Sequence, residues 1–256
     1  MGTRNPKGVA AVQMEWVPHE PQLACTIGTL TRGIGCYDFP ASVLATPNVG
    51  TSAVDGFALR FDGANYYGVV EGILGNLQSL NNWREIEAAI KNLSASVEAI
   101  TTSPFHQERV AVSYRFGGQL TALPLSLQSG GFRRFLAHFL AIYQQPPKQV
   151  VVFEEPENGI FPGALTMLWD FMRAANEKLG TQFILTTHSP QLLDAFDADS
   201  KRVVEISDRG TKIGPLAGGQ RSALMDKLLS PSELLTVTPP EMAISPRFIR
   251  PNSRVG

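Results

Sequence analysis

Two short apolar runs, at residues 149–153 and 182–187, constrain the fold most strongly. Both are too short for a typical helix and contain β-branched or aromatic side chains, a pattern typical of strands buried in a parallel sheet. Residues 165–179 between them carry apolar side chains at helical spacing, and Gly180 ends that segment. A strand–helix–strand unit of this length predicts two parallel strands joined by a right-handed crossover. We therefore expect an α/β domain whose sheet is covered by helices.

Before this unit the sequence predicts three helices and a β-hairpin. A strong amphipathic pattern begins near Ser129, and Gly117-Gly118 marks a tight turn between two strands. Two helices precede the hairpin, and the polar residues Asn81-Asn82 are expected to separate the first helix from the second. The segments that carry these patterns are 69–77 and 86–100 for the helical pair, and 109–116 and 119–123 for the hairpin.

The chain of 256 residues is long enough for one large domain or two tightly joined lobes. Short β-type runs without helical periodicity near the N-terminus predict a small antiparallel region. Beyond the apolar runs, a short helix from Pro190 and an edge strand at 202–207 are expected. The predicted parts are a β-rich part of a first lobe (1–62), a helical hairpin and strand (63–118), a core (119–235) and a flexible tail (236–256).

The composition narrows the class of protein. Lysine and arginine total 22 and aspartate and glutamate 23, which gives a formal charge of −1. This balance, with 43% hydrophobic residues, excludes a disordered chain and a generally basic nucleic-acid binder, so any nucleic-acid contact would be local. The only cysteines, Cys25 and Cys36, have no metal-ligand spacing and favour a reducing compartment. No apolar run could span a bilayer, and residues 1–20 lack the apolar core of a signal peptide. We expect a soluble, cytoplasmic protein with no membrane partner.

Polar residues that can carry chemistry follow both apolar runs. Glu154 and Glu155 end the first run, and His188 follows the second. Parallel α/β sheets bind ligands at the carboxyl ends of their strands, so these side chains are candidates for one site. Because successive strand side chains point in opposite directions, the two glutamates can divide two tasks, one binding Mg²⁺ through water and the other orienting a nucleophilic water. His188 is suited to donating to a phosphate oxygen. The competing interpretation is a solvated acidic strand end and a hydrogen-bonded turn histidine.

A Ser-Gly-Gly sequence precedes the amphipathic helix. Ser129 can cap the helix, and the amides of Gly130 and Gly131 then point outward with the positive end of the helix dipole, which is a geometry that binds anions. An ordinary capping turn is the competing interpretation. Arg133 and Arg134 follow one turn later, and for them a solvated helix face is the simplest expectation.

In order and spacing, the Ser-Gly-Gly segment, the strand end with Glu154 and Glu155, and the strand end with His188 resemble the ABC-type ATPases of the AAA-like SMC/RecF/OLD group. The likeness covers about residues 120–207 and extends more weakly back to Tyr66. It rests on the glycine-containing signature before its helix, on VVVFEEPENGIFP as Walker B with the following D-loop, and on FILTTHSPQLLDAF as the switch-histidine strand and helix.

The resemblance implies a P-loop NTPase fold in which two nucleotide domains sandwich ATP and Mg²⁺. Glu154 then takes the Walker B metal position, Glu155 the catalytic base position and His188 the switch position. Ser129, Gly130 and Gly131 take the signature, which would face the γ-phosphate held by the other subunit. A homodimer or a partner subunit that bears the P-loop is therefore expected, with a role in DNA maintenance or phage defence suggested only by the resemblance.

The sequence also departs from this family. No G-x-x-x-x-G-K-[S/T] motif occurs in the chain, so the loop amides and lysine that hold the β- and γ-phosphates have no counterpart in it. The chain therefore resembles a nucleotide domain that is incomplete at its N-terminus. Gln128 stands where many relatives have the signature serine, and Phe161 where many have histidine. Both changes weaken the expectation of full activity.

Three functions remain open from the sequence. The first is an ATP-binding and ATP-hydrolysing domain that dimerises around ATP. The second is a catalytically incomplete or split subunit that supplies the signature, Glu155 and His188 to a partner carrying the P-loop. The third is a metal-dependent hydrolase with Glu154, Glu155, Glu157 and His188 as ligands, which the turn at Pro156 disfavours because it would direct Glu157 away.

Overall fold

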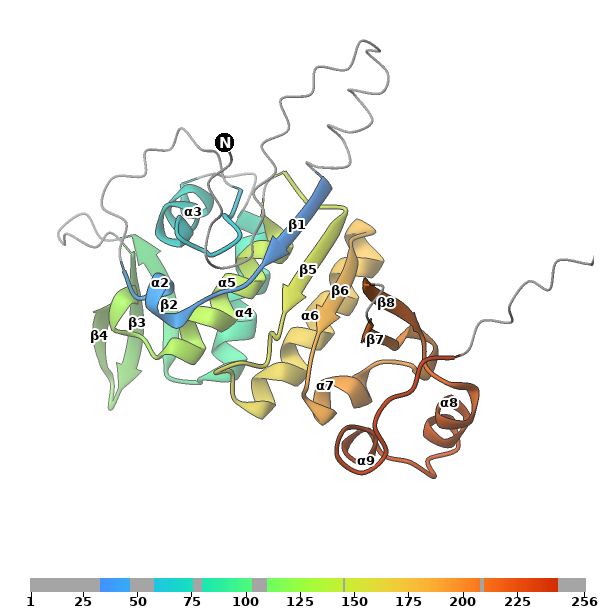
Figure 1. Cartoon of the computed structure of the whole chain (residues 1–256). Coiled ribbons are helices and arrows are strands. Elements are labelled where there is room, and N and C mark those ends of the chain that lie inside the picture. The colour runs from blue at the N-terminus through green and yellow to red at the C-terminus, as the bar shows by residue number, and fades with distance from the viewer. Residues whose placement is uncertain are drawn as a thin grey trace, which may run out of the picture.

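The computed structural model describes residues 33–46, 58–75, 80–102, 110–144, 146–207 and 210–243. Within these ranges the strands form a parallel sheet, an antiparallel sheet and a separate hairpin (Figure 1). The β-type runs expected at 9–12 and 23–26, together with Cys25, lie outside the described residues. Of the run expected at 54–61, residues 58–61 are described, and they do not form a strand. Cys36 is an exposed free thiol.

The parallel sheet has the strand order β1–β5–β6, formed by Ile34–Tyr37, Val150–Glu154 and Gln182–Thr186. In its register Val151 lies between Gly35 and Phe183. The prediction that the two apolar runs are parallel strands of one sheet is confirmed. The expected antiparallel arrangement is wrong for β1, which pairs parallel with β5. Alternate residues of both strands are buried, and in the register of the sheet they lie on the same face.

The two faces of this sheet differ. Val151 and Phe153 are buried on the face that packs against helices α5 (Gly130–Tyr143) and α6 (Pro162–Leu179). On the other face the side chain of Ile184 is 48% exposed. The expectation of strands buried on both faces is therefore wrong for β6, which in the described part of the chain is an edge strand paired only with β5.

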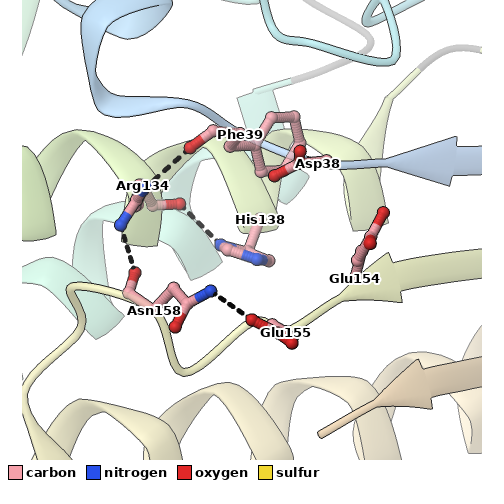
Figure 2. A pocket seen from close by; sticks show the side chains of 7 residues that line it. All are labelled: Asp38, Phe39, Arg134, His138, Glu154, Glu155 and Asn158. Atoms are coloured by element: carbon pink, nitrogen blue, oxygen red, sulfur yellow. Dashed lines mark hydrogen bonds between the residues drawn. The ribbon is translucent and has the colours of Figure 1, made fainter. Parts of the chain in front are cut away.

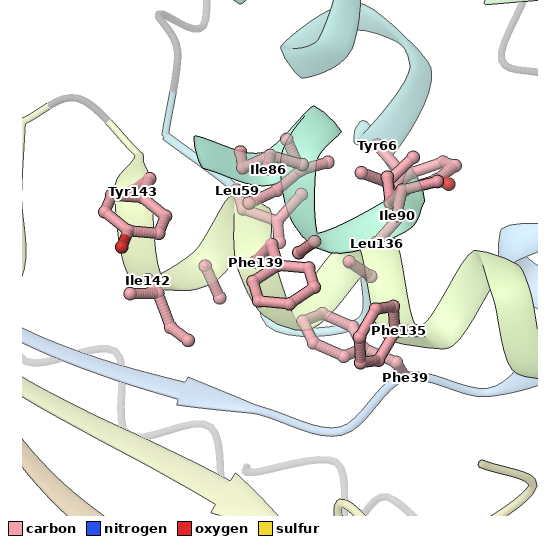
Figure 3. Close-up of a cluster of buried hydrophobic side chains, with 14 of the residues drawn as sticks. Phe39, Leu59, Tyr66, Ile86, Ile90, Phe135, Leu136, Phe139, Ile142 and Tyr143 are labelled. Atoms are coloured by element: carbon pink, nitrogen blue, oxygen red, sulfur yellow. The ribbon is translucent and has the colours of Figure 1, made fainter. Parts of the chain in front are cut away.

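Helix α5 lies at the centre of the core, and most of its side chains are buried. The rings of Phe135 and Phe139 pack edge to face, with centroids 4.5 Å apart. Figure 3 shows them in one cluster of buried side chains with Ile86 and Ile90 of helix α4 (Leu80–Leu93). The remaining elements around this core are α2 (Ala41–Leu44), α3 (Tyr66–Leu74), the 3₁₀ turn η3 (Leu125–Leu127) and α7 (Pro190–Ala195).

The antiparallel sheet has the order β2–β3–β4, formed by Val97–Thr102, Val110–Phe116 and Gln119–Pro124. Its β3–β4 hairpin turns at Gly117 and Gly118, which both have positive φ, as predicted. The second helix was expected to run to residue 100, but α4 ends at Leu93 and Val97 begins β2. Two apolar residues spaced three apart fit a helix and a short β-branched strand alike, so local periodicity misassigned them. Asn81 and Asn82 lie inside α4 and are not its break.

Strand β7 (Arg202–Ser207) was expected at the edge of the parallel sheet. It instead pairs antiparallel with β8 (Gly210–Pro215) in a separate hairpin. Around the hairpin lie η4 (Ala198–Ser200), α8 (Gly218–Met225) and α9 (Pro231–Thr236). The described start of the expected flexible tail is docked, since Met242 bridges to Leu216 and the Ala217 amide donates to the Glu241 carbonyl oxygen.

Candidate functional site

A pocket opens where β1 and β5 end (Figure 2). Asp38 directly follows β1, and Glu154 is the last residue of β5, so both carboxylates lie at the carboxyl edge of the sheet. Helix α5 provides the opposite wall. The residues that line the pocket are Asp38, Phe39, Arg134, His138, Glu154, Glu155 and Asn158. The strand ends therefore bring acidic groups to the edge where parallel α/β sheets bind ligands.

Glu155 has a left-handed backbone, with φ of 41°. This region is uncommon for a residue with a Cβ atom, so neighbouring bonds must hold it there. The Glu155 amide donates to the carbonyl oxygen and to the Oγ1 of Thr186, at 3.1 Å each. The Asn158 Nδ2 donates to the Glu155 Oε2 at 2.7 Å, and the Asn158 amide donates to the Glu155 carbonyl oxygen at 3.0 Å. These bonds anchor the turn after β5 to the end of β6.

The side chains of Glu155 and His188 lie together, as expected. The His188 Nε2 is 3.6 Å from the Glu155 Oε1, and the side chains are 85% and 38% exposed respectively. An open carboxylate beside an open imidazole can accept a proton from water and donate to an anion. The geometric expectation for this pair is confirmed, and its chemical roles stay predictions.

Glu157 points away from the pocket and toward the loop after β6. Its Oε1 accepts from the Thr187 Oγ1 at 2.7 Å, from the His188 amide at 2.8 Å and from the Ser189 amide at 3.1 Å. Within the described ranges, no group of three or more His, Cys, Asp or Glu side chains is arranged to hold a metal ion. The four-ligand metal site of the hydrolase hypothesis is therefore wrong, because Glu157 is already bonded elsewhere.

Arg134 connects the segment after β1 with the turn after β5. Its Nε donates to the Phe39 carbonyl oxygen at 2.8 Å, and its Nη1 donates to the Asn158 carbonyl oxygen at 2.6 Å (Figure 2). Arg133 is buried and donates to the carbonyl oxygens of Ser126 and Gln128. The expected solvated helix face is thus wrong for both arginines, because each satisfies backbone oxygens at a turn.

His138 lies beneath the pocket and is only 4% exposed. Its Nδ1 lies 2.7 Å from the carbonyl oxygen of Arg134, and its ring contacts Phe39 and Phe153 edge to face. Burial, which penalises the charged ring, lowers the pKa of His138 to about 4. The ring is therefore neutral at pH 7, with Nδ1 as the donor to the Arg134 oxygen.

The Ser-Gly-Gly segment has its expected cap. Ser129 Oγ accepts from the Phe132 amide at 3.2 Å, so Ser129 is the N-cap of α5. A Cβ atom on Gly131 would lie 2.6 Å from the Gly159 carbonyl oxygen, which shows how closely the helix approaches the turn after β5. Ser129, Gly130 and Gly131 do not line the pocket around Glu154 and Glu155. Their predicted role toward a nucleotide held by another subunit stays a prediction.

Gln128 and Phe161, the two residues that differ from the family pattern, can both be placed in the structure. Gln128 is buried, its Oε1 accepts from the Tyr114 hydroxyl, and its Nε2 donates to the Pro124 carbonyl oxygen at 3.2 Å. Phe161 is the N-cap position of α6, and its side chain is 54% exposed.

Sequence analysis missed four residues of the pocket, Asp38, Phe39, His138 and Asn158, and it missed the bridging role of Arg134. Asp38 follows a strand that the sequence pattern did not separate from its neighbours. Asn158 lies in the motif already identified, so its place directly after the carboxylates was an available signal. For His138 the signal was its position on the apolar stripe of α5, which predicts burial.

Several known proteins are similar to parts of this chain. Residues 72–194 match the family model described as "AAA domain, putative AbiEii toxin, Type IV TA system". Residues 72–194 are therefore similar to an AAA domain. The match includes α4, α5, α6, β5 and β6, and therefore Glu154, Glu155 and His188. The match supports an ATPase-like domain, as the sequence predicted.

A curated relative is ATP-binding cassette sub-family A member 9 of Mus musculus, which is 26% identical over 200 residues. The alignment covers 76% of this chain and 12% of that relative, so the chain spans only a small part of its length.

Solved structures of SMC proteins are also similar to the chain. One, described as showing ATP-driven dimerisation and DNA-stimulated activation of SMC ATPases, has a TM-score of 0.44 at 14% identity and covers 64% of this chain and 94% of its own. An Smc head domain of Pyrococcus furiosus has a TM-score of 0.41 at 15% identity, covering 64% of this chain and 39% of its own. No helix in the described ranges is long and apolar enough to cross a membrane.

Proposed function

We propose that this AAA domain binds ATP with Mg²⁺ and hydrolyses it, with Glu155 as the base that orients the attacking water. His188 donates to the terminal phosphate, and Glu154 faces the metal ion. The observation that carries the proposal is the pairing of Glu155 with His188 at 3.6 Å, at the carboxyl ends of neighbouring parallel strands. Mg²⁺ would supply charge neutralisation on the phosphate oxygens.

The residues present fit one half of such a site. Asp38 and Glu154 offer carboxylate oxygens at adjacent strand ends, and oxygen ligands suit Mg²⁺. Three carboxylates and one guanidinium line the pocket, so its net charge is negative and repels a triphosphate without a metal ion. The cradle for the β-phosphate has no counterpart, since no G-x-x-x-x-G-K-[S/T] occurs in the 256 residues. A further segment or subunit must therefore supply the phosphate-binding loop.

We propose further that the complete site forms in a dimer, either of two copies or with a subunit that bears the loop. The capped N-terminus of α5, with Ser129, Gly130 and Gly131, then faces the nucleotide held by the other subunit. Backbone amides at a helix N-terminus suit an anion, and the terminus offers about half a positive charge. That is too little to hold a triphosphate alone.

The second candidate is a catalytically incomplete subunit that completes the site of a partner and does not hold ATP itself. The missing phosphate-binding motif favours it. Under this alternative, Glu155 and His188 act only on nucleotide bound by the partner's loop.

Calorimetric titration of the purified chain with ATP and Mg²⁺, followed by a phosphate-release assay, separates the two candidates. We expect weak or no binding by the chain alone. Low-micromolar binding with turnover that Glu155→Gln abolishes would show that the chain is a complete ATPase and contradict the incomplete site. Turnover that appears only with a loop-bearing subunit, and is lost with Glu155→Gln, would support the shared site. Turnover that survives Glu155→Gln would rule out Glu155 as the base.

A further inference from the structure

The loop after β6 is held by a single carboxylate oxygen. Glu157 Oε1 accepts three hydrogen bonds, from the hydroxyl of Thr187 and from the amides of His188 and Ser189. Two of these donors are backbone groups on either side of the His188 side chain. Glu157 therefore fixes the backbone from which the imidazole projects, although it does not touch the imidazole itself.

The arrangement has an energetic cost, which suggests that it serves more than stability. Glu157 Oε2 is buried and has no hydrogen-bond partner among the described residues. Burying an unpaired carboxylate oxygen is unfavourable, and such groups call for an explanation in a native structure. Charge-assisted bonds to the loop amides offset part of that cost.

A second tie runs in the opposite direction between the same two segments. The Glu155 amide donates to Thr186, at the end of β6, and Glu155 itself has the left-handed backbone. The turn that carries Glu155 and Glu157 and the loop that carries His188 are thus cross-linked twice. Neither segment can shift without breaking bonds to the other.

We propose that Glu157 is a positioning residue that locks the His188 loop onto the Glu155 turn and so sets the distance between the two side chains. The catalytic consequence rests on the proposed function, and the mechanical lock does not. Without Glu157 the loop should move independently of the turn, and the His188 imidazole should leave the Glu155 carboxylate.

The lock is tested first by amide hydrogen exchange, measured by NMR on the full chain. In Glu157→Ala we expect the amides of His188 and Ser189 to exchange at least about 10-fold faster than in the wild type. Glu157→Gln keeps an oxygen acceptor of the same length and should stay within about 3-fold of the wild type. Glu177→Ala, at an exposed glutamate of α6, is the matched control and should change nothing. Unchanged exchange in Glu157→Ala would overturn the proposal.

A second measurement separates positioning from a structural role. In the wild type, Glu155→Gln should change the ring proton chemical shifts of His188, because the two groups are adjacent. In a Glu157→Ala background the same substitution should leave those shifts unchanged, and a persisting response would contradict the proposal. If Glu157→Ala fails to fold, Thr187→Val removes one of the three donors and should give an intermediate increase in the exchange of the His188 amide, whereas no increase there would count against the lock. The readout is His188 because the Ser189 amide also donates to the Thr187 Oγ1, at 2.9 Å, and loses that bond directly.

Where turnover is measured, with the loop-bearing subunit if required, Glu157→Ala should lower kcat about 10-fold or more and leave KM within about 3-fold, with activity kept in Glu157→Gln. An equal loss in both variants would contradict an acceptor-based lock. A chain without any turnover would refute the proposed hydrolysis, yet the exchange and chemical-shift results would still decide the lock.

Discussion

The Glu155 carboxylate and the His188 imidazole meet at 3.6 Å, although they belong to different strand ends joined by the whole of α6. Parallel pairing of β5 with β6 aligns the two strand ends, because Glu154 lies directly opposite Thr186. The pair is thus a consequence of sheet register, with the His188 side chain largely open to solvent and the Glu155 side chain partly buried.

Because the His188 side chain is exposed, it should contribute little to folding. We expect His188→Ala to change the free energy of unfolding by less than about 0.5 kcal/mol, as substitutions of exposed side chains typically do. Urea denaturation followed by circular dichroism measures this. A loss above about 2 kcal/mol would assign His188 a structural role and weaken the catalytic one.

The buried imidazole of His138 predicts a pH-dependent stability. Its pKa is about 4 in the folded chain, below the value of about 6.5 for an unperturbed histidine. Between these values the unfolded chain binds more protons, so stability falls as the pH drops from about 6.5 toward 4, by up to about 3 kcal/mol. Urea denaturation at several pH values, compared with His138→Leu, isolates this contribution. Equal pH slopes in both proteins would contradict it.

Gly131 is predicted to be intolerant of a side chain. A Cβ atom there would lie 2.6 Å from the Gly159 carbonyl oxygen, so Gly131→Ala should force the helix and the turn apart and cost about 1–3 kcal/mol. Gly219→Ala in α8 is the control, because nothing lies within 4 Å of its Cβ position and alanine favours helices. Thermal denaturation should show a lower Tm only for Gly131→Ala.

The centre of the core should depend on α5. Phe139 is fully buried between Phe135 and Phe171, so Phe139→Ala should destabilise the domain by about 3–5 kcal/mol. Phe116→Ala removes a ring that is 56% exposed and should cost much less. Chemical denaturation of both variants checks the difference, and equal losses would contradict the assignment of the core.

The sequence predicted best the elements that local periodicity defines. Helix α5, the β3–β4 hairpin and the β5–α6–β6 unit each carry a complete pattern within a short window. The parallel pairing followed from connection length and handedness. Glu155 and His188 were predictable for the same reason, because each follows a recognisable strand.

What sequence analysis missed depends on distant partners. Arg134 was expected in solvent because its acceptors, the carbonyl oxygens of Phe39 and Asn158, come from segments remote in sequence. β1 was assigned to an antiparallel region because its parallel partner lies more than a hundred residues later. Val97 fitted two periodicities, and only packing in the antiparallel sheet decided between them.

The left-handed backbone at Glu155 also bears on how this chain can change over generations. Glutamate and glycine codons differ by one base, and glycine adopts such a φ without the steric cost of about 1–2 kcal/mol that other residues carry. A mutation to glycine is therefore both readily reached and favourable for the backbone. Only selection for the carboxylate opposes it, so a homologue with glycine at this position is expected to have lost the chemistry while keeping the fold.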